Sequence, residues 1–199
     1  MRGGEELTTD SDLPFLRCGT APPEYEVTFD GGAREVNGTR RAGAGAALWG
    51  PDHGDGTREL VAAAHVPLPA EQHAQVAEAW GARLAVILLR LARPWGGVAR
   101  IVGDNLAVVR YCAGRARLHR LNLQRVLEPA LGALAVSGWR THWLAVRRRL
   151  NSAADQLATW AVEAASRLPV SMVPTPQVFA SWAAGERPAW LRMLFGPGQ

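Results

Sequence analysis

The sequence of 199 residues contains no lysine, so all 22 of its lysine-plus-arginine positions are arginine. A GC-rich gene is sufficient to explain this bias. Arginine nevertheless presents a planar, forked guanidinium that suits bidentate contacts with phosphate groups. With a formal net charge of +4, the composition is compatible with nucleic-acid binding but does not require it.

Cysteine is also scarce, since Cys18 and Cys112 are the only two. Two isolated cysteines exclude a disulfide framework and a cysteine-based zinc site. No apolar run approaches the roughly 20 residues that a transmembrane helix needs. The first residues, "MRGGEELTTDSDLPFLRCG", contain no hydrophobic segment of the signal-peptide type. We therefore expect an intracellular protein, cytoplasmic or nuclear, with no membrane partner.

The overall composition is that of a globular protein, with 48% hydrophobic and 20% charged residues. A chain of this length suits one domain of ordinary size. Residues 1–22 are predicted to be a disordered lead-in that ends near "APPE". Residues 23–168 are predicted to form the domain, and residues 169–199 a tail that contains proline and tryptophan.

The hydrophobic pattern predicts a mixed α/β domain. Three early apolar segments with short connections indicate strands of an antiparallel meander, and the later segments alternate between helical and extended patterns. The expected strands are 25–30, 41–50, 57–68, 98–104 and 139–146, and the expected helices are 71–95, 105–114, 117–138 and 151–168. We expect a five-stranded sheet, with three antiparallel strands and then two parallel additions, flanked by helices.

Tryptophan is comparatively frequent, with eight residues. Trp139 and Trp143 share one face of the fifth expected strand, and Trp160 lies in the last expected helix. We expect all three to be core residues.

Four carboxylates stand at or near the ends of these elements. Asp30 ends the first strand before two glycines, and Asp104 ends the fourth strand. Glu78 lies inside the first long helix, and Asp155 lies in the first turn of the last helix. Each has a simpler explanation: a turn for Asp30, a helix cap for Asp104, a solvated charge for Glu78, and the helix dipole for Asp155.

Taken together, the four carboxylates favour a metal site. Open sheets place their sites beyond the strand ends, and four carboxylates gathered there would repel one another unless cations neutralised them. Ligands that are all oxygen select Mg²⁺ or Mn²⁺.

Four segments resemble the signature segments of the ribonuclease H superfamily. They are "VTFDGGAREVNGTRRAGAGAALW", "AQVAEAWGARLAVILL", "RIVGDNLAVVRY" and "RRRLNSAADQLATWAVEAA". Their order and their strand and helix contexts are similar to those of the type 1 domains linked to retroelements and reverse transcriptases. The last segment of such domains commonly reads Arg-x-x-Asn-x-x-Ala-Asp, matched here by Arg148, Asn151, Ala154 and Asp155. The similarity covers residues 24–167.

The resemblance implies a ribonuclease H fold and an endonuclease that hydrolyses the RNA strand of RNA–DNA hybrids. It implies two Mg²⁺ ions, with Mn²⁺ as a substitute, which activate the attacking water and stabilise the leaving oxygen. Asp30 would bridge both ions, Glu78 and Asp104 would hold one, and Asp155 would hold the other.

The resemblance also implies partners and contacts with nucleic acid. The expected partner is an RNA–DNA hybrid, with a reverse transcriptase domain in a parent polyprotein, and the chain is expected to be a monomer. The break after Asp30 would let metal and phosphate approach the strand end. The residues expected to contact nucleic acid are Gly31, Gly32, Arg34, Gln75, Asn105, Arg148 and Asn151.

The chain departs from the family pattern at one position that matters for chemistry. Family members usually carry a histidine ten positions before the final aspartate, and here that position is Ala145. His142, three residues earlier, would substitute only if the strand were shorter than expected. The missing acid–base group predicts a slow enzyme. It also leaves two alternatives open: a weak or inactive module that binds hybrid or structured nucleic acid, and a nuclease of this fold that acts on DNA.

Overall fold

The computed structural model describes residues 24–70 and 72–167, together with the backbone of 179–182. The predicted lead-in, 1–22, and the predicted tail, 169–199, apart from 179–182, lie outside the described residues. None of the described helices combines the length and apolar character that crossing a membrane requires.

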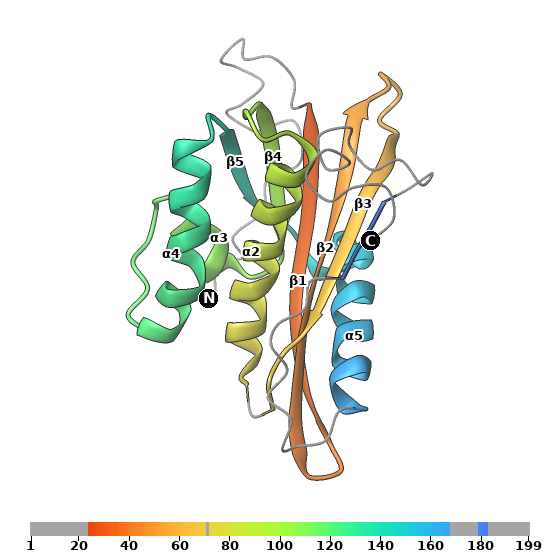
Figure 1. Ribbon diagram of the computed structural model, residues 1–199, viewed down its shortest axis with the longest axis vertical. Helices are drawn as coiled ribbons and strands as arrows, with labels where there is room; N and C mark the ends of the chain where they lie inside the picture. The colour runs from red at the N-terminus through yellow and green to blue at the C-terminus, as the bar shows by residue number, and fades with distance from the viewer. Residues whose placement is uncertain (1–23, 71, 168–178, 183–199) are drawn as a thin grey trace, which may run out of the picture.

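The described elements follow the predicted order of strands and helices (Figure 1). The strands are β1 (Tyr25–Val36), β2 (Thr39–Asp52), β3 (Arg58–Pro67), β4 (Val98–Gly103), β5 (Arg140–Ala145) and β6 (Phe179–Trp182). The helices are α2 (Ala74–Ala92), α3 (Leu106–Cys112), α4 (Leu121–Val136), α5 (Ser152–Ser166) and the short 3₁₀ helix η2 (Arg148–Leu150).

The sheet has the strand order β5-β4-β1-β2-β3-β6. β2 pairs antiparallel with both β1 and β3, whereas β4 pairs parallel with both β1 and β5. This confirms the predicted five-stranded mixed sheet, with three antiparallel strands and two parallel additions. The short strand β6, which the sequence pattern did not predict, pairs antiparallel with β3.

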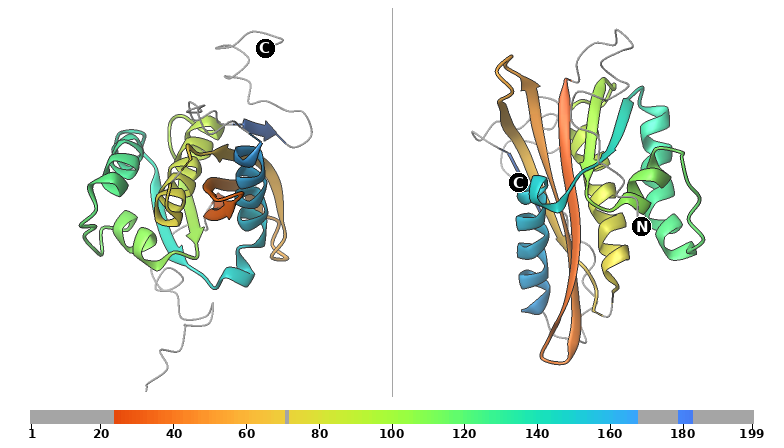
Figure 2. Two further views of the ribbon diagram at one scale, coloured as in Figure 1. Left: turned by 90° about the horizontal axis from the view of Figure 1, so that it is seen from below. Right: turned by 180° about the vertical axis from the view of Figure 1, so that it is seen from behind.

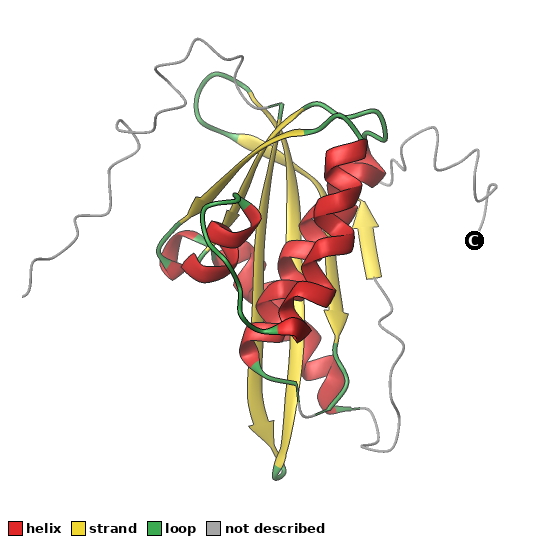
Figure 3. Ribbon diagram, turned by 90° about the vertical axis from the view of Figure 1, so that its left-hand side faces the viewer, coloured by secondary structure: helices red, strands yellow, loops and turns green. Residues whose placement is uncertain are grey.

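The expected break after Asp30 is wrong, because β1 runs on through Val36. Asp30 lies opposite Gly45 in an uninterrupted antiparallel ladder, and the hairpin turns at Asn37 and Gly38. Both turn residues have positive φ, 52° and 71°, as a two-residue hairpin turn demands. The hairpin extends past the ends of α2 and α5 (Figure 3).

Asp30 nevertheless lies level with the end of β4, the strand that pairs parallel with β1. The pairing of β1 with β4 ends at Thr28 and Val102, and β4 itself ends at Gly103. β1 therefore continues beyond the point where its parallel neighbour stops. The position that Asp30 occupies is the carboxyl end of β4, not the end of β1.

Helices α2 and α5 cover opposite faces of the sheet (Figures 1 and 2). Successive residues of a strand face opposite sides of the sheet. Gly31 therefore faces the opposite side from Asp30 and from Gly45, which pairs with Asp30. A Cβ on Gly31 would lie 2.0 Å from the backbone of Ala77 in α2, whereas one on Gly45 would lie 2.4 Å from Leu157 in α5. Helix α4 packs on α2 rather than on the sheet. The central part of the sheet is thus buried between two helices that approach its backbone closely.

Two of the three tryptophans are core residues, as predicted. Trp139 and Trp143 are each 7% exposed, and their rings make edge contacts with Tyr25 and Phe29 at centroid distances of 5.9 and 6.1 Å. The prediction for Trp160 is wrong, because this residue is 51% exposed. Residue 160 does not belong to the buried face of α5, which consists of Ala154, Leu157, Ala158, Ala161, Val162 and Ala165.

The close approach of β1 and α2 predicts different costs for two adjacent glycines. Gly31→Ala would force a methyl group into the α2 backbone and should destabilise the fold by about 1–3 kcal/mol. Gly32→Ala meets no atom within 4 Å and should be neutral or stabilising by about 0.4–1 kcal/mol. Urea unfolding of both variants in EDTA measures the difference. Equal midpoints for the two variants would contradict the packing described above.

Candidate metal centre

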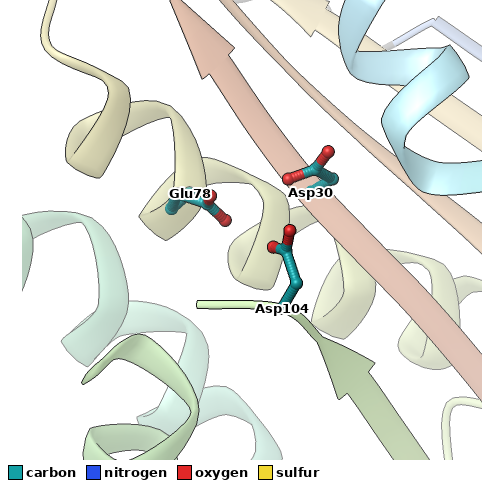
Figure 4. A group of neighbouring side chains, drawn as sticks. All are labelled: Asp30, Glu78 and Asp104. Carbon is teal, nitrogen blue, oxygen red and sulfur yellow. The ribbon is translucent and has the colours of Figure 1, made fainter. Parts of the chain in front are cut away.

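Three carboxylates from three separate elements meet at the carboxyl end of β4. Asp30 comes from the middle of β1, Glu78 from the second turn of α2, and Asp104 from the residue after β4. One carboxylate oxygen from each lies within 4.8 Å of the others. Figure 4 shows the three side chains directed at a shared space.

A backbone contact between β1 and α2 positions two of these carboxylates. A Cβ on Gly81 would lie 2.4 Å from the Asp30 carbonyl oxygen, so only glycine fits at this crossing. Glu78 stands one turn before Gly81, on the side of α2 that faces β1. Asp30 is fixed further by its own strand, because its Oδ1 accepts a hydrogen bond of 2.8 Å from the Gly31 N–H.

Asp104 is held at the start of α3 without serving as its cap. Asn105 is the N-cap residue, and its side chain accepts a hydrogen bond of 3.2 Å from the Val108 N–H. The simpler explanation of Asp104 as a helix cap is therefore wrong. Its carboxylate is left to face Asp30 and Glu78.

Two oxygens of this group are buried without a partner. Asp30 is 2% exposed, and both Glu78 Oε2 and Asp104 Oδ1 are buried with no hydrogen-bond partner among the described residues. A buried acceptor without a donor costs free energy. A divalent cation with oxygen ligands would satisfy both atoms and would offset the repulsion between the three charges, so the residues present fit such an ion.

The pKa values of the two central carboxyl groups reflect the same conflict. Burial and the charge of Asp104 raise the pKa of Asp30 from 3.8 to about 7. Burial, then the charges of Asp30 and Asp104, raise the pKa of Glu78 from 4.5 to about 9. Both shifts mean that the metal-free site resists full ionisation.

The fourth predicted carboxylate, Asp155, lies outside this group of three. It stands in the first turn of α5 and accepts hydrogen bonds from two nitrogens of Arg148, with Nε at 3.0 Å. Its charge still raises the pKa of Asp30, so the two carboxylates are close enough to repel. The structure therefore brings three of the four predicted residues together and leaves the fourth beside them, paired with an arginine.

Known structures of the same architecture were found by comparison. The N-terminal RNase H domain of rv2228c from Mycobacterium tuberculosis is similar at a TM-score of 0.60 and 25% identity, over 73% of this chain and 98% of that chain. The chain therefore has the fold of the ribonuclease H domains.

Two further structures share the fold. RNase H1 from the halophilic archaeon Halobacterium salinarum matches at a TM-score of 0.55 and 23% identity, over 70% of this chain and 98% of that one. LC11-RNase H1, solved with an RNA/DNA hybrid, matches at a TM-score of 0.58 and 19% identity, over 71% and 98%. No protein family model matches the chain, and no curated protein matches it by sequence.

Several residues predicted to contact nucleic acid already have partners within the ribonuclease H-like domain. Arg34 lies 3.6 Å from Glu163 of α5 in an exposed ion pair. Gln75, at the start of α2, accepts a hydrogen bond from Arg120. These contacts are at the surface and can exchange, so nucleic-acid binding by Arg34 and Gln75 stays a prediction, as it does for the cap residue Asn105.

Burial weighs against two of the other predicted contacts. Asn151 is 1% exposed and donates a hydrogen bond of 2.8 Å from its amide to the Phe29 carbonyl. The space beside Gly31 is filled by α2, whereas Gly32 has open space beside it. Asn151 and Gly31 thus have packing roles that the sequence pattern did not separate from ligand contact, and contact by Arg148 and Gly32 stays a prediction.

The position of the usual histidine lies at the site, but His142 does not. Ala145 pairs with Gly103 at the end of β4, next to Asp104, whereas His142 pairs with Arg100. Three residues of strand separate His142 from Ala145 by about 10 Å. Burial, then the charges of Arg140 and Arg115, lower the pKa of His142. Its place in the strand does not favour substitution for the missing histidine.

The stability of the metal-free domain should fall as pH rises. Asp30 and Glu78 have ordinary pKa values of 3.8 and 4.5 and folded values of about 7 and 9. Between about pH 4 and 9 the folded state therefore binds more protons than the unfolded state, so stability is lost through this window. Asp30→Asn should flatten the slope and make the metal-free variant more stable than wild type at pH 8.

Urea unfolding in EDTA from pH 4 to 9 measures this effect. The control is Glu59→Gln, which removes an exposed carboxylate from β3. Burial lowers the pKa of His65 and of His142, which makes stability rise with pH near neutrality in all three proteins. The difference between Asp30→Asn and the control therefore isolates the contribution of Asp30. If the free energy of unfolding had the same pH dependence in both variants, the raised pKa of Asp30 would be refuted.

Proposed function

We propose that this domain is a metal-dependent endonuclease of the ribonuclease H type, which hydrolyses the RNA strand of RNA–DNA hybrids. The observation that supports it is the group of Asp30, Glu78 and Asp104, whose oxygens lie within 4.8 Å of one another and include two buried atoms without a partner. The neighbours are RNase H1 domains, one of them solved with an RNA/DNA hybrid. Both features point to the same chemistry.

Asp30, Glu78 and Asp104 would hold one divalent ion, and Asp30 with Asp155 would hold a second. We propose Mg²⁺, with Mn²⁺ as a substitute, because all the ligand atoms are carboxylate oxygens. When bound, a pair of such ions supplies Lewis-acid stabilisation of the attacking and leaving oxygens in phosphodiester hydrolysis.

The residues of the chain prepare this site in three ways. The strand holds Asp30 in one orientation through the Gly31 N–H, so little conformational freedom is lost on binding an ion. Burial keeps bulk water from screening the charges of Asp30 and Glu78. The loss of protons from these two groups, which burial disfavours, must accompany metal binding.

The substrate would approach from the open side of the carboxylates. Gly32, Arg34, Gln75, Asn105 and Arg148 would contact the hybrid, Gly32 because nothing stands beside its Cα. We further propose that residues 23–168 suffice for activity and that the domain acts as an intracellular monomer. We also propose that the domain derives from a retroelement and that its partner is a reverse transcriptase domain.

One observation favours a second candidate function. Ala145 stands beside Asp104 where related domains carry a histidine, so a proton-transfer group is missing at the site. A domain that binds hybrid but turns it over slowly or not at all is consistent with this position. The two candidates differ in one measurable result, which is strand cleavage.

Cleavage of labelled substrates tests the proposal. RNA–DNA hybrid, RNA duplex and DNA duplex are incubated with the protein in Mg²⁺, in Mn²⁺ and in EDTA. We expect metal-dependent cutting of the RNA strand of the hybrid alone. Asp30→Asn should lower the rate by about 10³-fold or more, because it removes a ligand of both ions.

The matched control is again Glu59→Gln, an exposed carboxylate about 20 Å along β3 from the register of Asp30. It should cut at the wild-type rate. Tight binding of hybrid with no cutting in either metal would instead support the binding module. Cutting that Asp30→Asn leaves intact would exclude the carboxylate site.

A further inference from the structure

Arg148 forms an ion pair with Asp155 at the border of the metal centre. Its Nε and Nη2 atoms both donate to the same carboxylate oxygen, Asp155 Oδ1, with Nε at 3.0 Å. The guanidinium therefore occupies one of the two oxygens with which Asp155 would bind a cation. It is the positively charged group that the structure places on the fourth carboxylate.

The backbone holds the two partners in this arrangement. Arg148 begins η2, and Asp155 lies in the first turn of α5, with Asn151 between them. The carbonyl of Asn151 accepts a hydrogen bond of 3.0 Å from the Asp155 N–H, and its buried amide donates to Phe29, the residue before Asp30. Because Asn151 anchors this segment to β1, the pair forms at a fixed place beside Asp30.

The charge of Arg148 extends beyond Asp155. It lowers the pKa values of both Asp30 and Glu78, in opposition to burial and the neighbouring carboxylates, which raise them. Neither Arg147 nor Arg149, its neighbours in the chain, forms an ion pair within the described part of the protein. Of these three consecutive arginines, Arg148 is therefore the one whose charge lies beside the carboxylates.

We propose that Arg148 is an internal counter-ion that occupies the second cation position at Asp155 and is displaced when the second divalent ion binds. The inference rests on the proposed function and adds an order of binding to it. The first ion would enter among Asp30, Glu78 and Asp104, with which no arginine in the described ranges forms an ion pair. The second ion would bind more weakly, because it competes with the guanidinium for Asp155.

The exposure of the pair makes this competition moderate. The side chains of Arg148 and Asp155 are 73% and 35% exposed, and an exposed ion pair contributes little to stability. A divalent ion can therefore displace the guanidinium, which then returns to solvent at small cost. A fully buried pair would resist displacement, because its separated charges would stay desolvated.

Titration with Mn²⁺ alone, without nucleic acid, tests the proposal. Calorimetry of the full chain at low ionic strength should resolve a tighter and a weaker binding step. Arg148→Gln should tighten the weaker step about 2- to 10-fold, because it removes both the competing pair and a positive charge beside the site. The affinity of the tighter step should change less. Arg148→Lys keeps the charge without the forked guanidinium, so the affinity of its weaker step should lie between those of wild type and Arg148→Gln.

The matched control is Arg149→Gln, which removes the adjacent arginine and should leave both steps as in wild type. Asp155→Asn should abolish the weaker step and so identify it. If Arg148→Gln and Arg149→Gln give the same isotherm while wild type binds Mn²⁺ and cuts hybrid, the counter-ion role is wrong and the proposed function stands. If wild type binds no Mn²⁺ and cuts nothing, both fail.

Discussion

Strand β1 and helix α2 touch backbone to backbone, and the candidate metal centre depends on that contact. Gly31 and Gly81 are the two positions where a methyl group would collide with the opposite backbone. Because these two glycines have no side chains, Asp30 and Glu78 come close enough for their carboxylate oxygens to bind the same cation. In a close-packed interior, a shift of a few tenths of an ångström at this crossing would propagate to both carboxylates. The most demanding feature of the site is therefore a pair of residues with no functional group.

Electrostatic repulsion opposes what this packing achieves. Burial raises the pKa values of Asp30 and Glu78, so the fold holds together groups that would separate if they were free. Such conflict between local and global preference is common at functional sites, which proteins maintain with stability gained elsewhere. Here the apolar contacts of the sheet with α2 and with the buried face of α5 supply that stability. The arginine on Asp155 relieves only part of the repulsion.

The sequence predicted the sheet and the three central carboxylates well, for a physical reason. Hydrophobic period and turn residues determine which segments are strands and helices, and parallel strands end at a common edge. The sequence alone therefore places Asp104 near Asp30. The continuation of β1 was missed, because Asp30–Gly31 has the composition of a turn, whereas Asn37–Gly38 forms the actual one.

Other features had no signal in the local sequence. The burial of Asn151 depends on Phe29, a residue 122 positions away, and the Arg148–Asp155 pair spans a 3₁₀ turn for which no spacing rule applies. The packing of Gly31 against α2 could not be predicted, because a glycine that admits a ligand and one that admits a helix look the same in a sequence. The spacing of apolar residues predicts whether a segment is a helix or a strand. The role of each side chain depends on the elements that pack against it, and these contacts are distant in the sequence.

The short strand β6 has a consequence for how the protein can be shortened. It pairs with β3 along residues Ala62 to His65 and so satisfies main-chain groups on what would otherwise be the outer strand. A chain that ended at Arg167 would keep the carboxylate site but leave this border of the sheet uncovered. Unpaired strand borders recruit other strands, so such a shortened protein would tend to self-associate and lose solubility before its chemistry was affected.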